Sequence, residues 1–148
     1  MMMRSVMDKD VQEVLYSEEM IAEKVREMGA AISRDYEGKN LLMVSVLKGS
    51  VIFMADLMRA ITIPANIDFM SVSSYGSGVK TSGVVKIIKD LDQQLEGYDL
   101  LIVEDILDSG MTLSYLKRIL SERKPNSIRC RCGDYGDEFR MYLLFVGW

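Results

Sequence analysis

One stretch of the sequence, residues 100–112, joins an apolar run to side chains that could bind a phosphorylated ligand. The run is Leu-Leu-Ile-Val, and the polar residues that follow it are Glu104, Asp105, Asp108, Ser109, Gly110 and Thr112. A buried strand that opens into a helix at such a loop directs backbone N–H groups and hydroxyls at an anion, which the helix dipole also favours. A loop this short fits one phosphate group. It is not a Walker loop, because the sequence contains no Gly-x-x-x-x-Gly-Lys-Ser/Thr.

The carboxylates of this stretch suit the sugar that carries such a phosphate. Glu104 and Asp105 end the strand, where both can reach the two hydroxyls of a ribose or a Mg2+ ion bridging them. Asp108 is placed to accept a proton. The alternative is that Asp108 caps the helix while Glu104 and Asp105 are merely solvated. Carboxylates directly after a buried strand are costly to place without a role.

The sequence contains no histidine, which excludes Ser-His and Cys-His nucleophile pairs and His-ligated zinc. A general base must then be a carboxylate, Lys or Tyr. A metal ion is expected to be a hard cation on oxygen ligands, with Mg2+ the default. Cys130 and Cys132 are the only cysteines, and we interpret them as strand residues without a site of their own.

Composition predicts one globular domain. The 148 residues are 49% hydrophobic and 27% charged, and this length supports a proper core. The net charge is −4 with no basic stripe, so nucleic acid and anionic membranes are not expected partners. No apolar run approaches the roughly 20 residues that span a bilayer, and the first residues lack a signal core. We therefore expect a cytoplasmic protein.

The hydrophobic pattern alternates between strand-like runs and helical stripes. Helices are predicted from Ser17 to a stop at Gly38, at 51–61 and at 111–123, and strands at 41–47, 67–73, 84–89, 100–103 and 127–132. This order indicates an α/β domain with a mainly parallel sheet. Such sheets bind ligands at the carboxyl ends of their strands. Lys48-Gly49-Ser50 and residues 108–112 both follow strands in this way, although the first could be a plain turn.

These motifs resemble one known family. The features are Val46-Leu47-Lys48-Gly49-Ser50, Asp68-Phe69-Met70, Ser73-Ser74-Tyr75-Gly76, Ser82-Gly83-Val84-Val85 and the stretch Val103 to Thr112. From about Ser17 to Ile128 the chain resembles the bacterial hypoxanthine-guanine phosphoribosyltransferases of the type I phosphoribosyltransferase family. The resemblance implies a Rossmann-like, mainly parallel sheet flanked by helices, with a flexible loop and an incomplete hood.

The resemblance also implies how the phosphoribosyl donor would be bound. Ser109, Gly110 and Thr112 would bind the 5-phosphate of phosphoribosyl pyrophosphate. Glu104 and Asp105 would contact the ribose hydroxyls, directly or through Mg2+.

Further roles implied by the resemblance concern the transfer itself. Asp108 would be the acid/base residue facing the purine. Lys48 and Gly49 would hold the pyrophosphate, and the peptide bond before Lys48 is a candidate cis peptide. Ser74 and Tyr75 would belong to a flexible loop that closes over the reacting centre, although residues 74–83 could be only a hairpin loop.

The sequence departs from the family pattern past Ile128. A Lys-Pro segment that reads the purine, and the aromatic-apolar pair after it, find no match. The pattern resumes at Asp134, where the family residue helps bind Mg2+, and at Arg140, where it contacts pyrophosphate. We therefore expect a single domain over 1–148, family-like at 17–128 and degenerate at 129–148, with a few tens of residues missing from its purine pocket.

Two functions follow from these expectations. The first is purine salvage, in which 5-phosphoribose passes from phosphoribosyl pyrophosphate to hypoxanthine or guanine, giving IMP or GMP plus pyrophosphate. The second is a catalytically impaired module that binds ribose phosphates or nucleotides without turnover. Relatives of this family commonly form homodimers or homotetramers, and the same is expected here.

Overall fold

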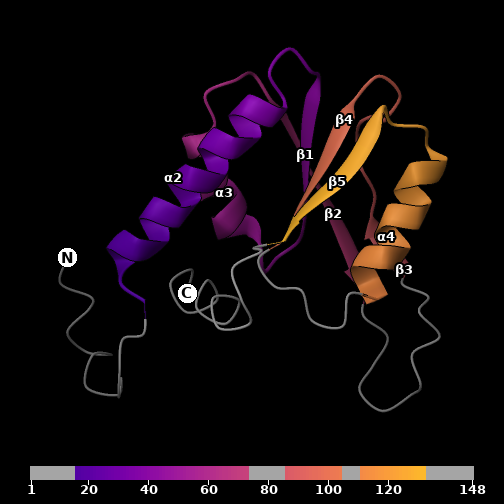
Figure 1. The fold of residues 1–148 in the computed structure, drawn as a ribbon. Helices are drawn as coiled ribbons and strands as arrows, with labels where there is room; N and C mark the ends of the chain where they lie inside the picture. Colours follow the sequence, from indigo (N-terminus) through magenta and orange to yellow (C-terminus); the bar gives the residue numbers. More distant parts are fainter. Residues whose placement is uncertain (1–15, 74–85, 105–110, 133–148) are drawn as a thin grey trace.

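The computed structural model describes residues 16–73, 86–104 and 111–132. The helices within these ranges are α2 (Glu18–Asp35), α3 (Val51–Ala60) and α4 (Met111–Glu122). The strands are β1 (Leu41–Val46), β2 (Asn66–Ser73), β3 (Lys86–Lys89), β4 (Asp99–Glu104) and β5 (Ser127–Cys132) (Figure 1). Within the described residues, every helix and strand predicted from the periodicity is present, with ends that match or differ by one or two residues.

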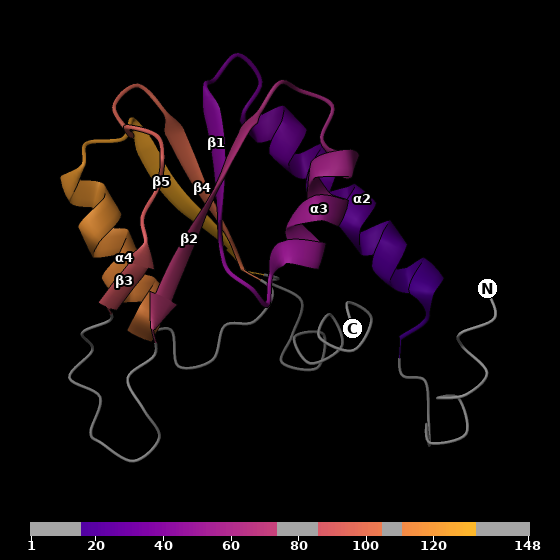
Figure 2. The ribbon, with the colours of Figure 1, turned by 180° about the vertical axis from the view of Figure 1, so that it is seen from behind.

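The strands form one mixed sheet in the order β3-β2-β1-β4-β5. β1 pairs in parallel with β2 and β4, and β4 pairs in parallel with β5. β3 returns antiparallel to β2. Helices α2 and α3 cover one face of this sheet and α4 covers the other, as the two opposite views show (Figures 1 and 2). The predicted α/β class with a mainly parallel sheet is confirmed.

The central strands are apolar along their whole length because both of their faces are covered. In β1, Leu41 and Met43 pack in the core under α2 and α3, whereas Leu42 and Val44 pack in the core under α4. In β4, Leu100 to Val103 alternate between the same two cores. These runs therefore show no alternation of polar and apolar residues.

Helix ends lie where the sequence signals placed them. Ser17 caps α2, its hydroxyl accepting a hydrogen bond from the Met20 N–H at 3.2 Å. Gly38 takes a positive φ of 74° just after this helix, a conformation that favours glycine. α3 ends at Ala60 and the chain is extended at Ile61, three residues before Pro64.

Helices α2 and α3 approach each other closely at Gly29. A Cβ atom built on Gly29 would lie 2.5 Å from both the Cβ and the carbonyl oxygen of Ala60. The Ser33 hydroxyl fastens the contact, since it donates to the Gly29 carbonyl at 2.7 Å and accepts from the Thr62 N–H at 3.0 Å. Glycine is therefore required at position 29 by space.

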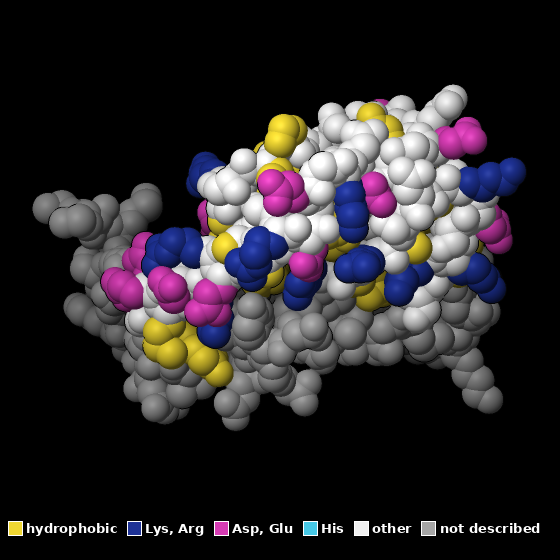
Figure 3. Space-filling model, turned by 45° about the horizontal axis from the view of Figure 1, so that its top comes forward, with side chains coloured by type: hydrophobic (Ala, Val, Ile, Leu, Met, Phe, Trp, Pro, Cys, Tyr) yellow, Lys and Arg dark blue, Asp and Glu magenta, His cyan; other side chains and the backbone are white. Residues whose placement is uncertain are grey.

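The surface carries mixed charge on the face drawn in Figure 3. There Lys and Arg side chains lie among Asp and Glu side chains rather than in a patch of one sign. Opposite charges also pair one helical turn apart on α2, with Lys24 and Glu27 at 2.9 Å and Arg26 and Glu23 at 2.5 Å. None of the helices in the described ranges has the length and hydrophobicity needed to cross a membrane.

Candidate active site

The predicted phosphate motif is framed by the end of a buried strand and the start of a helix. β4 ends at Glu104, a partly exposed residue that follows the buried Val103, and α4 starts at Met111. Thr112 is the second residue of α4 and is exposed. The predicted strand before the connection and the predicted helix after it are thus confirmed. Asp105, Asp108, Ser109 and Gly110 lie in the connection, outside the described residues.

The second predicted loop follows the neighbouring strand. Lys48 and Gly49 are exposed between β1 and α3, and the Leu47–Lys48 peptide bond is cis, as the resemblance implied. The Leu47 N–H donates to the Met70 carbonyl of β2 at 2.7 Å. The loop is therefore tied to the sheet at the carboxyl ends of β1 and β2.

Register brings the two loops to one edge of the sheet. Ser45 of β1 pairs with Val103 of β4, so the chain leaves both strands at the same level, and hydrogen-bonded neighbours lie about 4.8 Å apart. Lys48 and Glu104, which carry opposite charges, thus lie at the ends of two adjacent strands. A ligand spanning both would meet a cation on one side and a carboxylate on the other.

The remaining predicted site residues come after β2 and β5 in the sequence. Ser74 and Tyr75 follow the end of β2, and Asp134 and Arg140 follow the end of β5. All four lie outside the described residues, so their roles stay predictions.

The donor chemistry at the described edge fits a hard cation. Glu104 offers carboxylate oxygens, the ligand type that Mg2+ takes in proteins. The other predicted ligands, Asp105 and Asp134, are not described, and the described ranges contain no group of three or more His, Cys, Asp or Glu that could hold a metal ion. Cys130 is half-buried in β5 and packs against the core under α4, in agreement with a structural cysteine.

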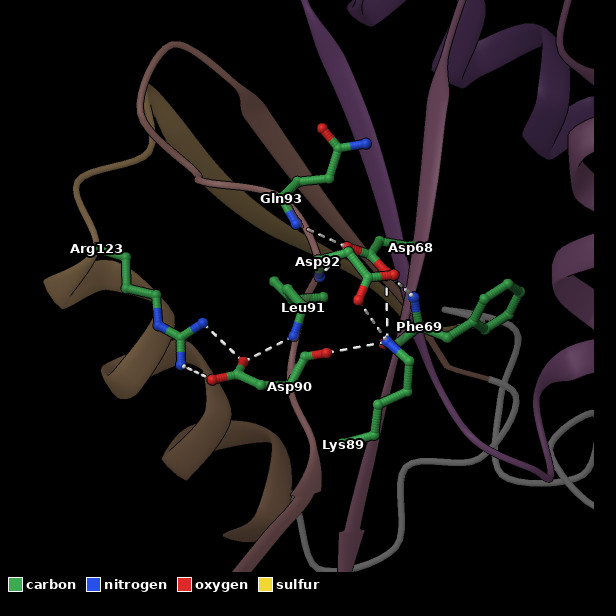
Figure 4. Close-up of polar contacts among 8 residues, drawn as sticks. All are labelled: Asp68, Phe69, Lys89, Asp90, Leu91, Asp92, Gln93 and Arg123. Carbon is green, nitrogen blue, oxygen red and sulfur yellow. Dashed lines mark hydrogen bonds and ion pairs between the residues drawn. The ribbon is translucent and has the colours of Figure 1, made fainter.

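Sequence reasoning assigned no role to Asp68, a buried carboxylate on β2. One of its oxygens accepts from its neighbour's N–H, that of Phe69, at 2.8 Å. The other accepts from the N–H groups of Asp92 and Gln93 at 2.8 and 3.3 Å (Figure 4). The Lys89 ammonium lies 3.8 Å from the oxygen that accepts from Phe69. Asp68 therefore fastens the connection between β3 and β4 onto β2. A carboxylate inside an apolar strand run was the available signal.

Lys89 and Asp90 extend these contacts to α4. The Lys89 ammonium donates to the carbonyls of Phe69 and Asp90 at 3.0 and 2.9 Å. The Asp90 carboxylate receives two hydrogen bonds from Arg123, both 2.7 Å long (Figure 4). Arg123 directly follows α4, so the helix that begins at the phosphate motif is tied to β2 and β3 at its other end.

The Asp90–Arg123 pair predicts a pH-dependent contribution to stability. The hydrogen bonds from Arg123 lower the pKa of the Asp90 carboxyl, so the stabilisation is present at neutral pH and is lost as the pH falls through that lowered pKa. We expect Arg123→Gln to reduce the free energy of unfolding at pH 7 by less than about 1 kcal/mol, because both side chains are partly exposed. Urea unfolding at successive pH values, from 7 to well below the usual Asp pKa of about 3.9, would show the difference vanishing.

The matched control for this variant is Arg59→Gln. Arg59 is more exposed and meets Asp56 at 3.5 Å through a single contact, so its loss should change stability less at every pH. An Arg123→Gln deficit that persists unchanged in acid would contradict the assignment.

Comparisons with known proteins agree with this geometry. Residues 11–132 match the phosphoribosyl transferase domain family. The hypoxanthine-guanine phosphoribosyltransferase of Streptococcus pyogenes is 50% identical over 124 residues, which are 84% of this chain and 69% of that protein. The bifunctional protein TilS/HprT of Listeria innocua is 52% identical over 123 residues, or 83% of this chain and 19% of that larger protein.

A solved structure of a related enzyme also matches this chain in fold and sequence. The hypoxanthine phosphoribosyltransferase of Staphylococcus aureus superposes with a TM-score of 0.82 at 47% identity, covering 88% of this chain and 71% of that one. The family match stops at residue 132, close to Ile128, where the sequence pattern was expected to depart. With its sheet, its cis peptide loop and its phosphate motif in the family's order, the chain belongs to the phosphoribosyltransferases, among their hypoxanthine-guanine members.

Proposed function

We propose that this chain transfers 5-phosphoribose from phosphoribosyl pyrophosphate to hypoxanthine or guanine, giving IMP or GMP and releasing pyrophosphate. The observation that carries the proposal is the edge where the Lys48–Gly49 loop and the end of β4 stand side by side, with the phosphate motif continuing into α4. The two relatives that support it are named as phosphoribosyltransferases, one of hypoxanthine and guanine and the other of hypoxanthine.

The donor's phosphate and sugar would occupy the end of β4 and the start of α4. Ser109, Gly110 and Thr112 would bind the 5-phosphate, which the positive end of the α4 dipole favours. Glu104 and Asp105 would bind the ribose hydroxyls.

The leaving group and the proton would be handled by other residues around the same edge. Lys48, Gly49 and Arg140 would bind the pyrophosphate, and Asp108 would exchange a proton with the purine. Ser74 and Tyr75 would help exclude water from the cation-like transition state. Bound Mg2+ would neutralise the charge of the leaving pyrophosphate, and Glu104, Asp105 and Asp134 would hold it.

The alternative is a module that binds ribose phosphates or nucleotides without turnover. The departure of the sequence from the family pattern past Ile128 favours it, because the family's purine-reading residues belong to that part. A homodimer or homotetramer and a cytoplasmic location remain expectations from the sequence, to be tested by light scattering and cell fractionation.

The deciding experiment supplies the purified protein with Mg2+, phosphoribosyl pyrophosphate and either purine, and measures nucleotide by chromatography. We expect IMP or GMP to form. Lys48→Ala should slow product formation at low donor concentration by about 10–100-fold, since a hydrogen bond to a charged group contributes about 1.5–3 kcal/mol. Lys39→Ala is the matched control, because Lys39 precedes β1 at the opposite edge of the sheet.

The outcomes separate the two functions. No nucleotide with either purine, combined with calorimetric binding of phosphoribosyl pyrophosphate, would replace the enzyme by the binding module. No binding of phosphoribosyl pyrophosphate at all would overturn both.

A further inference from the structure

Two buried serines bond to each other beneath the exposed Lys48–Gly49 turn. Ser45 on β1 is 0% exposed and Ser50, directly before α3, is 1% exposed. Their hydroxyls are hydrogen-bonded to each other, and the Ser50 hydroxyl also donates to the Val46 carbonyl at 2.8 Å. Because Ser50 has one hydroxyl proton, Ser45 is the donor within the pair.

These hydrogen bonds connect the two ends of the turn. They join residues 45 and 46, before the turn, to residue 50 after it. The backbone is held on both sides as well, since the Leu47 N–H donates to Met70 and the Val51 N–H donates to the Lys48 carbonyl at 3.2 Å. Lys48 and Gly49 are thus the exposed residues of a turn, and the residues on either side of them are held by hydrogen bonds.

Ser50 lies at the N-cap position of α3, but its side chain does not cap the helix. Serine before a helix usually caps it, a contact worth about 1 kcal/mol, and Ser17 does so for α2. Ser50 makes no side-chain cap hydrogen bond to α3 in the described part of the chain. Its hydroxyl is turned toward the turn instead.

We propose that Ser45 and Ser50 are positioning residues that hold Lys48 and Gly49 ready for the pyrophosphate group of the donor. The inference rests on the proposed function, because it presumes that this turn receives pyrophosphate. A turn already held in its binding conformation does not lose freedom when the anion arrives, and affinity improves accordingly. Neither serine needs to touch the ligand.

The test compares two ligands that differ by the pyrophosphate group. Calorimetry with Mg2+ would measure phosphoribosyl pyrophosphate, which engages the turn, and ribose 5-phosphate, which does not. We expect Ser50→Ala to weaken the first by about tenfold, because a loosened turn would weaken the charge-assisted contact between Lys48 and the pyrophosphate, and to leave the second within a factor of about two. Ser45→Ala, which keeps the bond from Ser50 to Val46, should give a smaller loss of the same kind.

Ser33→Ala is the matched control. Ser33 is also buried, at 7% exposed, and its hydroxyl also makes two hydrogen bonds, but these join α2 to the end of α3. Its loss should lower thermal stability while leaving the affinity ratio of the two ligands unchanged. If Ser50→Ala and Ser45→Ala weaken both ligands equally, or neither, the positioning role is overturned. If the unmodified protein binds neither ligand, the proposed function fails first.

Discussion

Gly29→Ala is expected to lower the free energy of unfolding by about 2–3 kcal/mol, the upper part of the range for overpacking a core. The new methyl group would meet the Cβ and the carbonyl oxygen of Ala60 at 2.5 Å and its carbonyl carbon at 2.7 Å. Two of these atoms are backbone, so they cannot yield without moving α3 away from α2. The loss outweighs the gain of about 1 kcal/mol that alanine brings to a helix interior.

Urea unfolding followed by circular dichroism would measure the effect against two controls. Ala30→Gly changes an exposed neighbour in the same helical turn and isolates the propensity difference of about 0.5–1 kcal/mol. Ala60→Gly added to Gly29→Ala removes one of the contacts and should restore part of the stability. A Gly29→Ala protein as stable as the unmodified one would show that the two helices can separate without cost.

The central strands were predictable from sequence because their environment is uniform. Leu41 to Val44 and Leu100 to Val103 are covered on both faces, and continuous apolar runs of this length are typical of strands in a parallel sheet between helices. The order of strand and helix then fixed which loops meet at the carboxyl edge. The Lys48-Gly49-Ser50 loop was predicted at the carboxyl end of a strand on that basis, and the register shows that this loop and the end of β4 lie at the same edge of the sheet.

The contacts that depend on distant chain segments were not predictable. Asp68 was identified only as part of a motif, because its partners lie 24 and 25 residues further along. A glycine inside α2 is unfavourable by helix propensity alone, and only the approach of α3 explains Gly29. Ser50 stands where a serine ordinarily caps a helix, and only the position of Ser45 shows that its hydroxyl serves the turn.

Asp68→Asn is expected to destabilise the protein by about 2–4 kcal/mol, as for leaving buried polar groups unpaired. Asp68 is 6% exposed, and both of its oxygens accept from backbone N–H groups. An asparagine amide has one NH2 group, which in either orientation would point a donor at another donor. The connection containing Asp92 and Gln93 would then lose its attachment to β2.

Asp92→Asn is the matched control, because the same change is made in a side chain that is 81% exposed. The Asp92 carboxylate meets Lys89 at 3.5 Å, and such surface pairs contribute about 0–1 kcal/mol. The Asp92 backbone N–H, which donates to the Asp68 carboxylate, is unchanged by this substitution. Urea unfolding would compare the two variants, and amide hydrogen exchange at Asp92 and Gln93 should accelerate in Asp68→Asn. Equal losses in both variants would mean that the carboxylate charge, and not the buried hydrogen bonds of Asp68, stabilises this connection.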